Sequence, residues 1–288
     1  MFNLKPEKIN FNHELGSGAF GTVYPYQRDL DDMKWVVKHL YAKNVDTMLT
    51  FLPEIILGFS CDHPNVVPVK GYCIEQAKPK GFNVYIKFPR MKESLKQKFS
   101  QKMQENDCFS EEEIIQIFHT LTLGIEYLHE KKIYHRDIKP DNILLDFDGN
   151  PVISDIGIGK FVAEDETNYL LSDKGGTPYY SAPEIVAGDP NLKKGDLCKA
   201  DAWSLGVVIA ELCLMKQKLI NPINFTLDKN KDYLEGHLER LQKVYGKLLV
   251  NILSGLLTFD LAKRKTVKEV REILEQNYPL ILVVWGNM

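Results

Sequence analysis

One short stretch of the chain combines side chains that can accept a proton, hold a cation and neutralise negative charge. The stretch reads His135, Arg136, Asp137, Ile138, Lys139, Pro140, Asp141 and Asn142, and Asp155 follows thirteen residues after the asparagine. Phosphoryl transfer from a nucleoside triphosphate needs positioning, cations that neutralise the phosphates and an acceptor for the hydroxyl proton. These residue types and spacings therefore point to chemistry on a chain of phosphates.

Each of these side chains suits one part of that chemistry. Asp137 can take the proton as a general base, and Lys139 can offset charge on the transferred group. Asn142 and Asp155 offer oxygen ligands from separate loops, which suits Mg²⁺ that bridges phosphates. The alternative is a polar loop capped by Asp and Asn and broken by Pro. The presence of every residue type at its spacing favours the chemical interpretation.

A glycine-rich turn near the N-terminus offers a second contact with phosphates. It has the pattern G-x-G-x-x-G and comprises Gly16, Ser17, Gly18, Ala19, Phe20 and Gly21. A dinucleotide-binding turn of this pattern opens a helix, whereas the β-branched residues and the proline at 22–25 predict a strand. An ordinary glycine-rich hairpin is the alternative. A strand–turn–strand hairpin can lay its backbone N–H groups over phosphates because glycine has no Cβ.

Lys38 lies inside an apolar stretch that we expect to be a strand. A lysine in such a place must find a counter-charge or shift its pKa. A nucleotide phosphate would supply the counter-charge, and so would Glu54 on the helix that we expect next. Since alternation along a strand often exposes lysines, a solvent-facing Lys38 is the third interpretation that the strand allows.

The pattern of apolar residues predicts an α+β chain of two lobes. Strands are expected at 9–15, 22–26, 34–40 and 82–88, with one helix at 50–60 between them. From residue 91 the pattern becomes helical: Ser110 and Glu113 form a capping-box signature, and apolar residues recur at helical spacing behind them through Leu128. Further helices are expected at 200–215, 233–257 and 267–276. Ligand sites favour the cleft between two such lobes.

Composition excludes several classes of protein. Lys plus Arg number 36 and Asp plus Glu 39, so the net charge of −3 argues against general nucleic-acid binding. The five cysteines are scattered without CxxC spacing, which predicts a reducing compartment such as the cytoplasm. The N-terminus shows no apolar signal-peptide core. The longest apolar run, 280–285, is far shorter than the roughly 20 residues that cross a bilayer, so we expect no membrane span.

Taken together, the motifs resemble those of a eukaryotic protein kinase domain of the serine/threonine type, from about Phe11 to about Gln276. The set continues with Ala182-Pro183-Glu184 and with the segment from Asp201 to Gly206. Arg264 resembles the family's arginine that pairs with the glutamate at the position of Glu184. The resemblance implies a small antiparallel β lobe with one regulatory helix (1–88), a hinge (89–91) and a larger, mainly helical lobe (92–288).

The resemblance also implies a role for each matching residue. The backbone of the glycine-rich turn would cover ATP, and Lys38 would hold its α- and β-phosphates and pair with Glu54. Asp137 would be the base, with Mg²⁺ on Asn142 and Asp155. Thr177 and Lys139 resemble the serine/threonine type, with protein Ser or Thr as acceptor. The adenine contacts would come from Val23, Val36 and Leu144, from Phe88 as gatekeeper, and from the main chain of Pro89 and Met91.

Two other classes of function stay open at this point. One is a pseudokinase, a scaffold that keeps the fold without efficient catalysis. The other is a small-molecule kinase, which the segment from Thr177 to Glu184 disfavours because it suits peptide docking. Lys38, Asp137, Asn142 and Asp155 are all present, which favours the enzyme.

Some residues depart from the family pattern. Ile156 replaces the usual aromatic residue, and isoleucine still supplies apolar packing. Gly58 stands where a large apolar residue is usual, and Pro53 precedes Glu54. We therefore expect the Lys38–Glu54 pair to be held less firmly than in typical relatives.

The sequence allows several interpretations of how the activity would be regulated. Arg136 precedes the base, as in kinases that are switched by loop phosphorylation. Asp173 could supply the negative charge to Arg136 permanently, Ser172 or Thr167 could be phosphorylated instead, or Asp173 could be a solvated loop charge. Asp141 and Glu211 match positions that bind basic substrate residues in some relatives. Four lysines are expected on a solvated helix face: Lys92, Lys96, Lys98 and Lys102.

Overall fold

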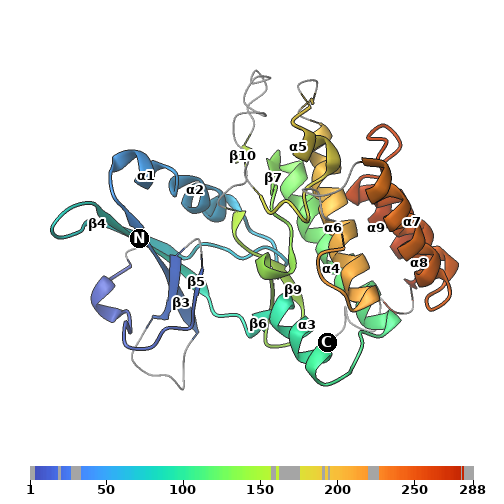
Figure 1. Cartoon of the computed structure of the whole chain (residues 1–288). Coiled ribbons are helices and arrows are strands. Elements are labelled where there is room, and N and C mark those ends of the chain that lie inside the picture. Colours follow the sequence, from blue (N-terminus) through green and yellow to red (C-terminus); the bar gives the residue numbers. More distant parts are fainter. Residues whose placement is uncertain are drawn as a thin grey trace.

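The computed structural model describes residues 4–18, 21–26, 34–156, 160–161, 176–189, 192–193, 195–219, 227–279 and 281. The chain folds into an antiparallel β lobe and a larger helical lobe (Figure 1). The β lobe has a five-stranded sheet in the order β1-β2-β3-β5-β4. Its elements are β1 (Gly16–Gly18), β2 (Gly21–Pro25), β3 (Trp35–Ala42), β4 (Gly71–Gln76) and β5 (Phe82–Pro89), with the helices α1 (Val45–Leu49) and α2 (Leu52–Ser60).

The glycine-rich hairpin is confirmed. β1 pairs antiparallel with β2, and the register places Gly18 opposite Gly21. Gly21 has a φ of +110°, and a Cβ there would clash with the carbonyl oxygen of His39. Only glycine adopts this conformation at no steric cost. Glycine at position 21 therefore allows the backbone of β2 to lie close to β3.

Alternation along β3 decides which side chains reach α2. Val36 and Lys38 are two residues apart, and successive strand side chains point to opposite faces, so these two share a face. The apolar cluster on the helix side contains Leu40, Ile55 and Ile86. Burial of such side chains contributes about 1.5–3 kcal/mol each, which anchors α2 to the sheet.

Some of the expected elements of the small lobe differ from the structure. The segment 9–15 is not a strand: Pro6–Lys8 forms a 3₁₀ turn, and Ile9 makes only an isolated bridge to Tyr26. Ile9 is nevertheless buried, in a cluster with Leu4 and Val37 on the other face of the sheet. Its hydrophobicity therefore reflects burial of a loop residue, a signal that apolar pattern alone cannot separate from a strand.

The helical lobe is built around two long helices. α4 begins at the predicted capping box, in which Ser110 Oγ accepts from the Glu113 N–H and Glu113 caps the Ser110 N–H. α6 is buried on nearly all sides, as expected of a helix that is apolar all round. The remaining elements are β6 (Glu93–Ser94), α3 (Leu95–Gln104), α4 (Glu111–Glu130), β7 (Ile133–Tyr134), η2 (Pro140–Asn142), β8 (Ile143–Leu145), β9 (Pro151–Ile153), β10 (Lys160–Phe161), α5 (Pro183–Ala187), α6 (Asp196–Leu214), α7 (Leu227–Gln242), α8 (Lys247–Leu256) and α9 (Val267–Asn277).

Two expectations for this lobe were wrong. The segment 233–257 is two helices, because the chain leaves the helix after Gln242 and begins α8 at Lys247. Lys102 is buried rather than solvated: its Nζ donates to Asp107 Oδ2 at 2.7 Å and to the Cys108 carbonyl at 2.9 Å. Among the helices that the structure describes, none combines the length and apolarity needed to cross a bilayer.

Candidate active site

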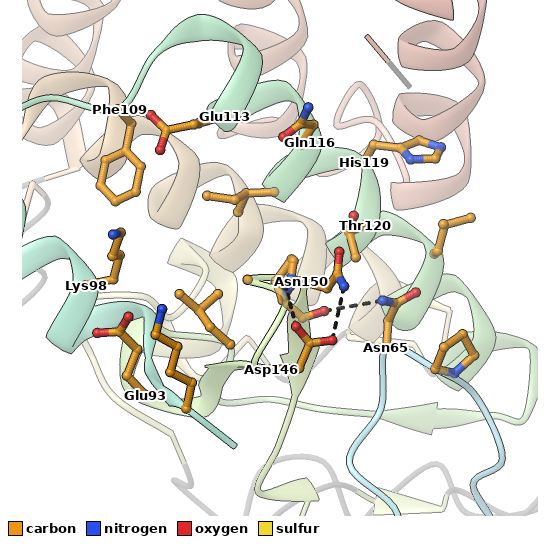
Figure 2. Close-up of a pocket in the computed structure, with 17 residues that line it drawn as sticks. Asn65, Glu93, Lys98, Phe109, Glu113, Gln116, His119, Thr120, Asp146 and Asn150 are labelled. Atoms are coloured by element: carbon orange, nitrogen blue, oxygen red, sulfur yellow. Dashed lines mark hydrogen bonds between the residues drawn. The ribbon is translucent and has the colours of Figure 1, made fainter. Parts of the chain in front are cut away.

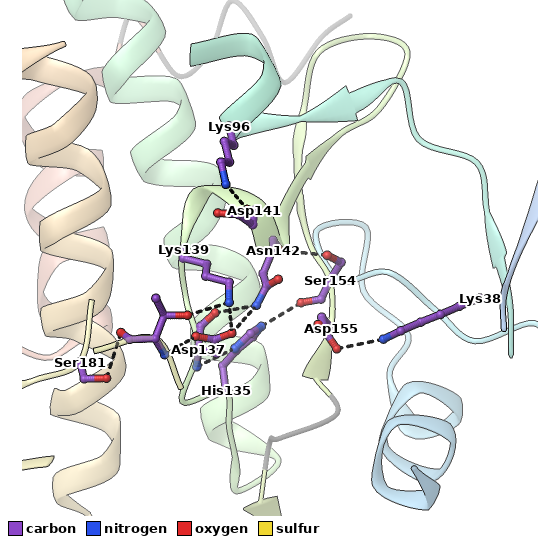
Figure 3. A network of polar contacts seen from close by, with 11 residues as sticks. Lys38, Lys96, His135, Asp137, Lys139, Asp141, Asn142, Ser154, Asp155 and Ser181 are labelled. Atoms are coloured by element: carbon purple, nitrogen blue, oxygen red, sulfur yellow. Dashed lines mark hydrogen bonds and ion pairs between the residues drawn. The ribbon is translucent and has the colours of Figure 1, made fainter. Parts of the chain in front are cut away.

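The carboxylate of Asp137 is the centre of a closely bonded cluster in the helical lobe (Figure 3). One oxygen, Oδ2, accepts from Lys139 Nζ at 2.5 Å and from Asn142 Nδ2 at 2.9 Å. The other oxygen accepts from the Thr177 N–H at 2.8 Å. Asp137 is only 3% exposed. The hydrogen bonds to both of its oxygens hold the carboxylate in one orientation.

Thr177 reaches this cluster from a distant part of the chain. Its hydroxyl accepts a hydrogen bond from Lys139 Nζ at 2.7 Å, so one ammonium group bridges Asp137 and Thr177. The preceding Gly176 has a φ of +105°, and a Cβ there would lie 2.6 Å from the Arg136 carbonyl oxygen. Glycine therefore allows the segment to pass close to the loop. The hydroxyl group of a molecule bound beside Asp137 and Lys139 would lie among a carboxylate, an ammonium group and this threonine.

The loop that carries Asp137 is held from behind by α6. The buried carboxylate of Asp201 accepts from the His135 N–H at 2.9 Å and from the Arg136 N–H at 2.8 Å. Arg136 adopts a left-handed backbone with a φ of +67°, a conformation that costs a non-glycine residue about 1–2 kcal/mol. The two bonds to Asp201 help offset that cost, and they fix the backbone immediately before Asp137.

A third partner of Asp201 is His129 of α4, which sequence reasoning missed. Its Nε2 lies 2.8 Å from Asp201 Oδ2. Burial disfavours the charged ring, but hydrogen bonds with Asp201 and Cys198 outweigh it and raise the pKa of His129 to about 9. A histidine at the end of an apolar helix gives no signal of this role, because its partner is 72 residues away.

This shift makes stability depend on pH. The folded-state pKa of about 9 lies above the ordinary value of 6.5. The protonated ring therefore makes its full contribution to the stability of the folded protein below pH 6.5, and this contribution is lost as the pH rises through about 9. Linkage makes the contribution up to about 3 kcal/mol. We expect wild type to lose that much more unfolding free energy than His129→Gln between pH 6 and 10, measured by urea denaturation. Equal losses in both proteins would contradict the assignment.

The second polar cluster joins the small lobe to the segment after β9. Lys38 Nζ lies 2.8 Å from Glu54 Oε1, 2.9 Å from Glu54 Oε2 and 3.3 Å from Asp155 Oδ1. Burial lowers the pKa of Lys38, but the two carboxylates outweigh it and the pKa is raised. Asp155 has a φ of +58°, a left-handed conformation that is uncommon outside glycine and concentrates at functional sites.

The expectation of a loosely held Lys38–Glu54 pair was wrong. Pro53 lies in the first turn of α2, where the missing N–H costs no helical bond. A Cβ on Gly58 would clash with Val69 Cγ2, so Val69 fills the space beside the helix that a larger side chain at position 58 would need. Glycine here therefore preserves the packing of α2 instead of loosening it.

Replacing that glycine tests the packing. Gly58→Ala gains about 1 kcal/mol of helix propensity but overpacks a β-branched neighbour, which costs about 1–3 kcal/mol. We expect a net destabilisation of about 1 kcal/mol in urea denaturation. The matched control is Gly236→Ala on α7, where a Cβ meets nothing within 4 Å. That change should stabilise the protein, and a stabilised Gly58→Ala would show that Val69 yields.

The two residues expected to bind a metal ion, Asn142 and Asp155, come from segments that meet at Ser154. Asn142 donates from Nδ2 to the carbonyl and the carboxylate of Asp137, which orients its amide and leaves Oδ1 as the acceptor. Asp155 Oδ1 contacts Lys38. The Ser154 N–H donates to the Asn142 carbonyl at 2.9 Å, so the two ligand-bearing segments are hydrogen-bonded to each other.

Several of the residues expected around adenine lie on neighbouring strands. In the register of the sheet, Val23 of β2 lies opposite Lys38 of β3, and Val36 of β3 lies opposite Phe88 of β5. The side chains of these four residues therefore share one face of the sheet. All four are half-buried. The others lie at or beyond the junction of the lobes: Leu144 is in β8, Pro89 ends β5 and Met91 follows it.

Several expected regulatory and phosphate-binding residues lie outside the described residues: Ala19, Phe20, Thr167, Ser172 and Asp173. Asp141 pairs with Lys96 at 2.6 Å on the surface. Glu211 is buried, accepts from the Tyr180 hydroxyl at 2.9 Å, and burial raises its pKa to about 7. Glu211 is therefore bonded within the fold.

The segment after Thr177 is tied to the end of the lobe by a buried ion pair. Arg264 Nη1 and Nη2 contact the two carboxylate oxygens of Glu184 at 2.6 and 2.9 Å. The guanidinium also lies 4.9 Å from the centroid of the Trp203 ring. The pairing expected from the motif at 182–184 is confirmed, and it fixes the start of α5.

Comparisons with known proteins agree with this geometry. Residues 9–278 match the family described as the protein kinase domain. The chain is 31% identical over 208 residues to CBL-interacting protein kinase 26 of Oryza sativa subsp. japonica (70% of this chain, 39% of the relative). It is 28% identical over 267 residues to serine/threonine-protein kinase dst2 of Dictyostelium discoideum (92% and 22%), and 28% over 279 residues to serine/threonine-protein kinase Nek10 of Homo sapiens (90% and 22%). The chain spans less than half the length of these relatives. It belongs to the protein kinase domain family.

Proposed function

We propose that the chain transfers the γ-phosphoryl group of ATP to serine or threonine hydroxyls of protein substrates. The observation that carries the proposal is the bridge made by Lys139, whose ammonium contacts both Asp137 Oδ2 and Thr177 Oγ1. This bridge links the candidate base to the segment that would receive a peptide. The relatives are named serine/threonine kinases, which supports the same acceptor chemistry.

Asp137 acts as the base in this proposal. The substrate hydroxyl oxygen forms a bond to the γ-phosphorus, the bond from that phosphorus to the oxygen bridging to the β-phosphate breaks, and ADP leaves with the bonding pair. The hydroxyl proton passes to Asp137. Lys139 offsets negative charge on the transferred group, and Thr177 keeps Lys139 and Asp137 aligned. Positioning and electrostatics supply most of the catalysis in such transfers.

Lys38, Glu54 and the adenine contacts position ATP. Lys38 faces the α- and β-phosphates, and Glu54 holds its ammonium in place. Val23, Val36 and Leu144 pack on adenine, Phe88 closes the pocket behind it, and the main chain of Pro89 and Met91 bonds its polar edge. Pro89 can offer only its carbonyl, since proline has no N–H. Residues 89–91 serve as the hinge between the lobes.

Asn142 and Asp155 are the proposed ligands of Mg²⁺. An amide oxygen and a carboxylate oxygen are hard donors, and Mg²⁺ commonly takes one or two protein oxygens together with substrate phosphates and waters. Bound there, the ion would neutralise phosphate charge. The protein also orients the Asn142 side chain for this role, because Asn142 Nδ2 donates hydrogen bonds to the carbonyl and the carboxylate of Asp137.

The direct test is transfer of labelled phosphate from ATP to a generic protein, followed by identification of the phosphorylated residue. We expect label on serine and threonine, a requirement for a divalent cation, and none on small-molecule alcohols. Label on tyrosine, or none above the level of the Asp137→Asn variant, would contradict the proposal, and the latter result would indicate a pseudokinase.

A further inference from the structure

A second carboxylate lies close to the candidate base, and a lysine of another element already pairs with it. Asp141 lies in η2, and its Oδ1 contacts Lys96 Nζ at 2.6 Å. Figure 3 shows this pair beside the network of Asp137, Lys139 and Asn142. Both side chains are accessible, since 42% of the Asp141 side chain and 50% of the Lys96 side chain are exposed. A protein substrate could therefore reach the pair.

The segment after Thr177 connects Asp141 to the place where a substrate would bind. Burial and Glu211 raise the pKa of the Tyr180 hydroxyl most, and the charges of Asp141 and Asp137 add to this shift, so both carboxylates lie near Tyr180. Asp141 follows Asp137 by four residues, so their Cα atoms are at most about 14 Å apart, the span of about four extended residues. If the proposed function holds, a peptide with its acceptor at Asp137 has a nearby residue beside Asp141.

The other carboxylate near Tyr180 is not accessible in this way. Glu211 is only 1% exposed. Its Oε2 accepts from the Tyr180 hydroxyl at 2.9 Å, and its Oε1 accepts from the Lys218 N–H. A substrate side chain would have to break these bonds inside the fold to reach Glu211. Of these two carboxylates, Asp141 is therefore the one that a substrate can contact.

The fold fixes the place from which Lys96 reaches Asp141. Lys96 is the second residue of α3, which begins at the capping box formed by Ser94 and Gln97. Leu95 is fully buried, which fixes the rotation of this first turn. Ser94 pairs with Leu144 of β8, the strand that directly follows η2. The first turn of α3 and η2 are therefore held close together.

A lysine is locally unfavourable at this point of a helix. The N-terminal end of a helix carries partial positive charge, which favours carboxylates and disfavours cations. The first turn of α3 contains no acidic residue. Asp141 supplies negative charge to Lys96 from outside the helix, and Lys96 neutralises Asp141 in return. A substrate cation that binds Asp141 must therefore displace Lys96.

We infer that Lys96 determines which charge the protein selects beside the acceptor residue of its substrate. Lys96 occupies Asp141 as a basic substrate residue would, so the wild-type protein does not select arginine or lysine at that position. Without Lys96, the free carboxylate binds a substrate arginine, whose guanidinium can donate two hydrogen bonds to one carboxylate. Without Asp141, the free ammonium group binds a substrate glutamate instead.

The test compares four proteins on one set of peptides. The pair is balanced in wild type, negative in Lys96→Met, positive in Asp141→Asn and uncharged in the double variant. Each peptide contains one serine, with arginine, glutamine or glutamate at one of the four positions before or after it and uncharged residues elsewhere. The kcat/KM of each charged peptide is divided by that of the matching glutamine peptide, which removes any general effect of a variant on activity.

We expect one position in the peptides at which the four proteins differ. There, Lys96→Met should prefer arginine about threefold to fivefold, and Asp141→Asn should prefer glutamate by a similar factor. Wild type and the double variant should show less than about a twofold preference for either charge. Raising the salt concentration should reduce both preferences, because the contacts are accessible to solvent.

A matched control and a second measurement complete the test. Lys98 belongs to the same helix but lines a groove with Phe109 and Glu113 (Figure 2), so Lys98→Met should keep the wild-type ratios. Fluorescence anisotropy with labelled peptides that carry alanine in place of serine gives the same ratios as Kd values, without phosphoryl transfer. Absence of transfer would therefore contradict the kinase proposal, while the Kd values still decide this inference.

Three results would overturn the inference. The first is a wild-type preference for arginine above about fivefold, and the second is equal ratios in all four proteins. The third is no saturable binding of any arginine peptide to Lys96→Met up to about 1 mM. Melting curves of the variants show whether each protein is folded.

Discussion

Asp137→Asn should lower phosphoryl transfer by about 10²- to 10⁴-fold while the protein stays folded and still binds ATP. The amide cannot take the hydroxyl proton, yet it has nearly the shape of the carboxylate. It can still accept the Thr177 N–H bond that Oδ1 accepts at 2.8 Å in the wild type. The loss should therefore appear in kcat rather than in the KM for ATP. Steady-state rates with labelled ATP and a melting curve provide the measurement.

Asp148→Asn is the matched control for this variant. Asp148 is exposed in the turn between β8 and β9, and the change removes one carboxylate from the same region of the chain. We expect a rate within about twofold of wild type, since surface changes of this kind are nearly neutral. If Asp137→Asn retained more than about a tenth of the wild-type rate, Asp137 would not be the base.

Arg264→Leu should cost about 3–5 kcal/mol of unfolding free energy. The arginine side chain is 0% exposed and its partner Glu184 is 9% exposed, so removing the guanidinium leaves a carboxylate without its counter-charge where water cannot replace it. Two further acceptors, the carbonyls of Thr258 and Lys199, also lose their donor. Equilibrium urea denaturation measures the change.

The neighbouring lysine gives a control for that measurement. Lys263 is 79% exposed in its side chain, and Lys263→Leu should change stability by at most about 0.5 kcal/mol. The double variant Arg264→Leu/Glu184→Leu should recover part of the loss, because no unpaired charge stays buried. A loss of less than about 1 kcal/mol in Arg264→Leu would show that Glu184 finds water or another donor.

Sequence reasoning identified those features that local spacing determines. The glycine-rich hairpin and the capping box at Ser110 follow from short motifs, and the pairing of Arg264 with Glu184 was implied by the resemblance to the protein kinase family. The structure confirms all three. The roles proposed for Asp137, Asn142 and Asp155 came from the same kind of signal, and their test is activity. Asp137 and Asn142 lie in one short loop, and Asp155 follows the asparagine by thirteen residues.

Features that depend on contacts between residues distant in the sequence were not predicted from it. Lys102 belongs to a lysine-rich helix that looks solvated, but Asp107 and the Cys108 carbonyl bind its ammonium inside the fold. His129 gains its partner from α6, and Val69 compensates for Gly58 from another segment. α1 and β4 were not predicted either, because short elements carry too few residues for a periodic signal.

Asp201 holds the loop that carries Asp137 in a way that does not depend on the side chain at position 136. Asp201 binds peptide N–H groups of His135 and Arg136, and every residue except proline carries such a group. Substitution of the Arg136 side chain would therefore leave this anchorage intact. As far as this contact is concerned, the loop that carries Asp137 tolerates any side chain other than that of proline at position 136.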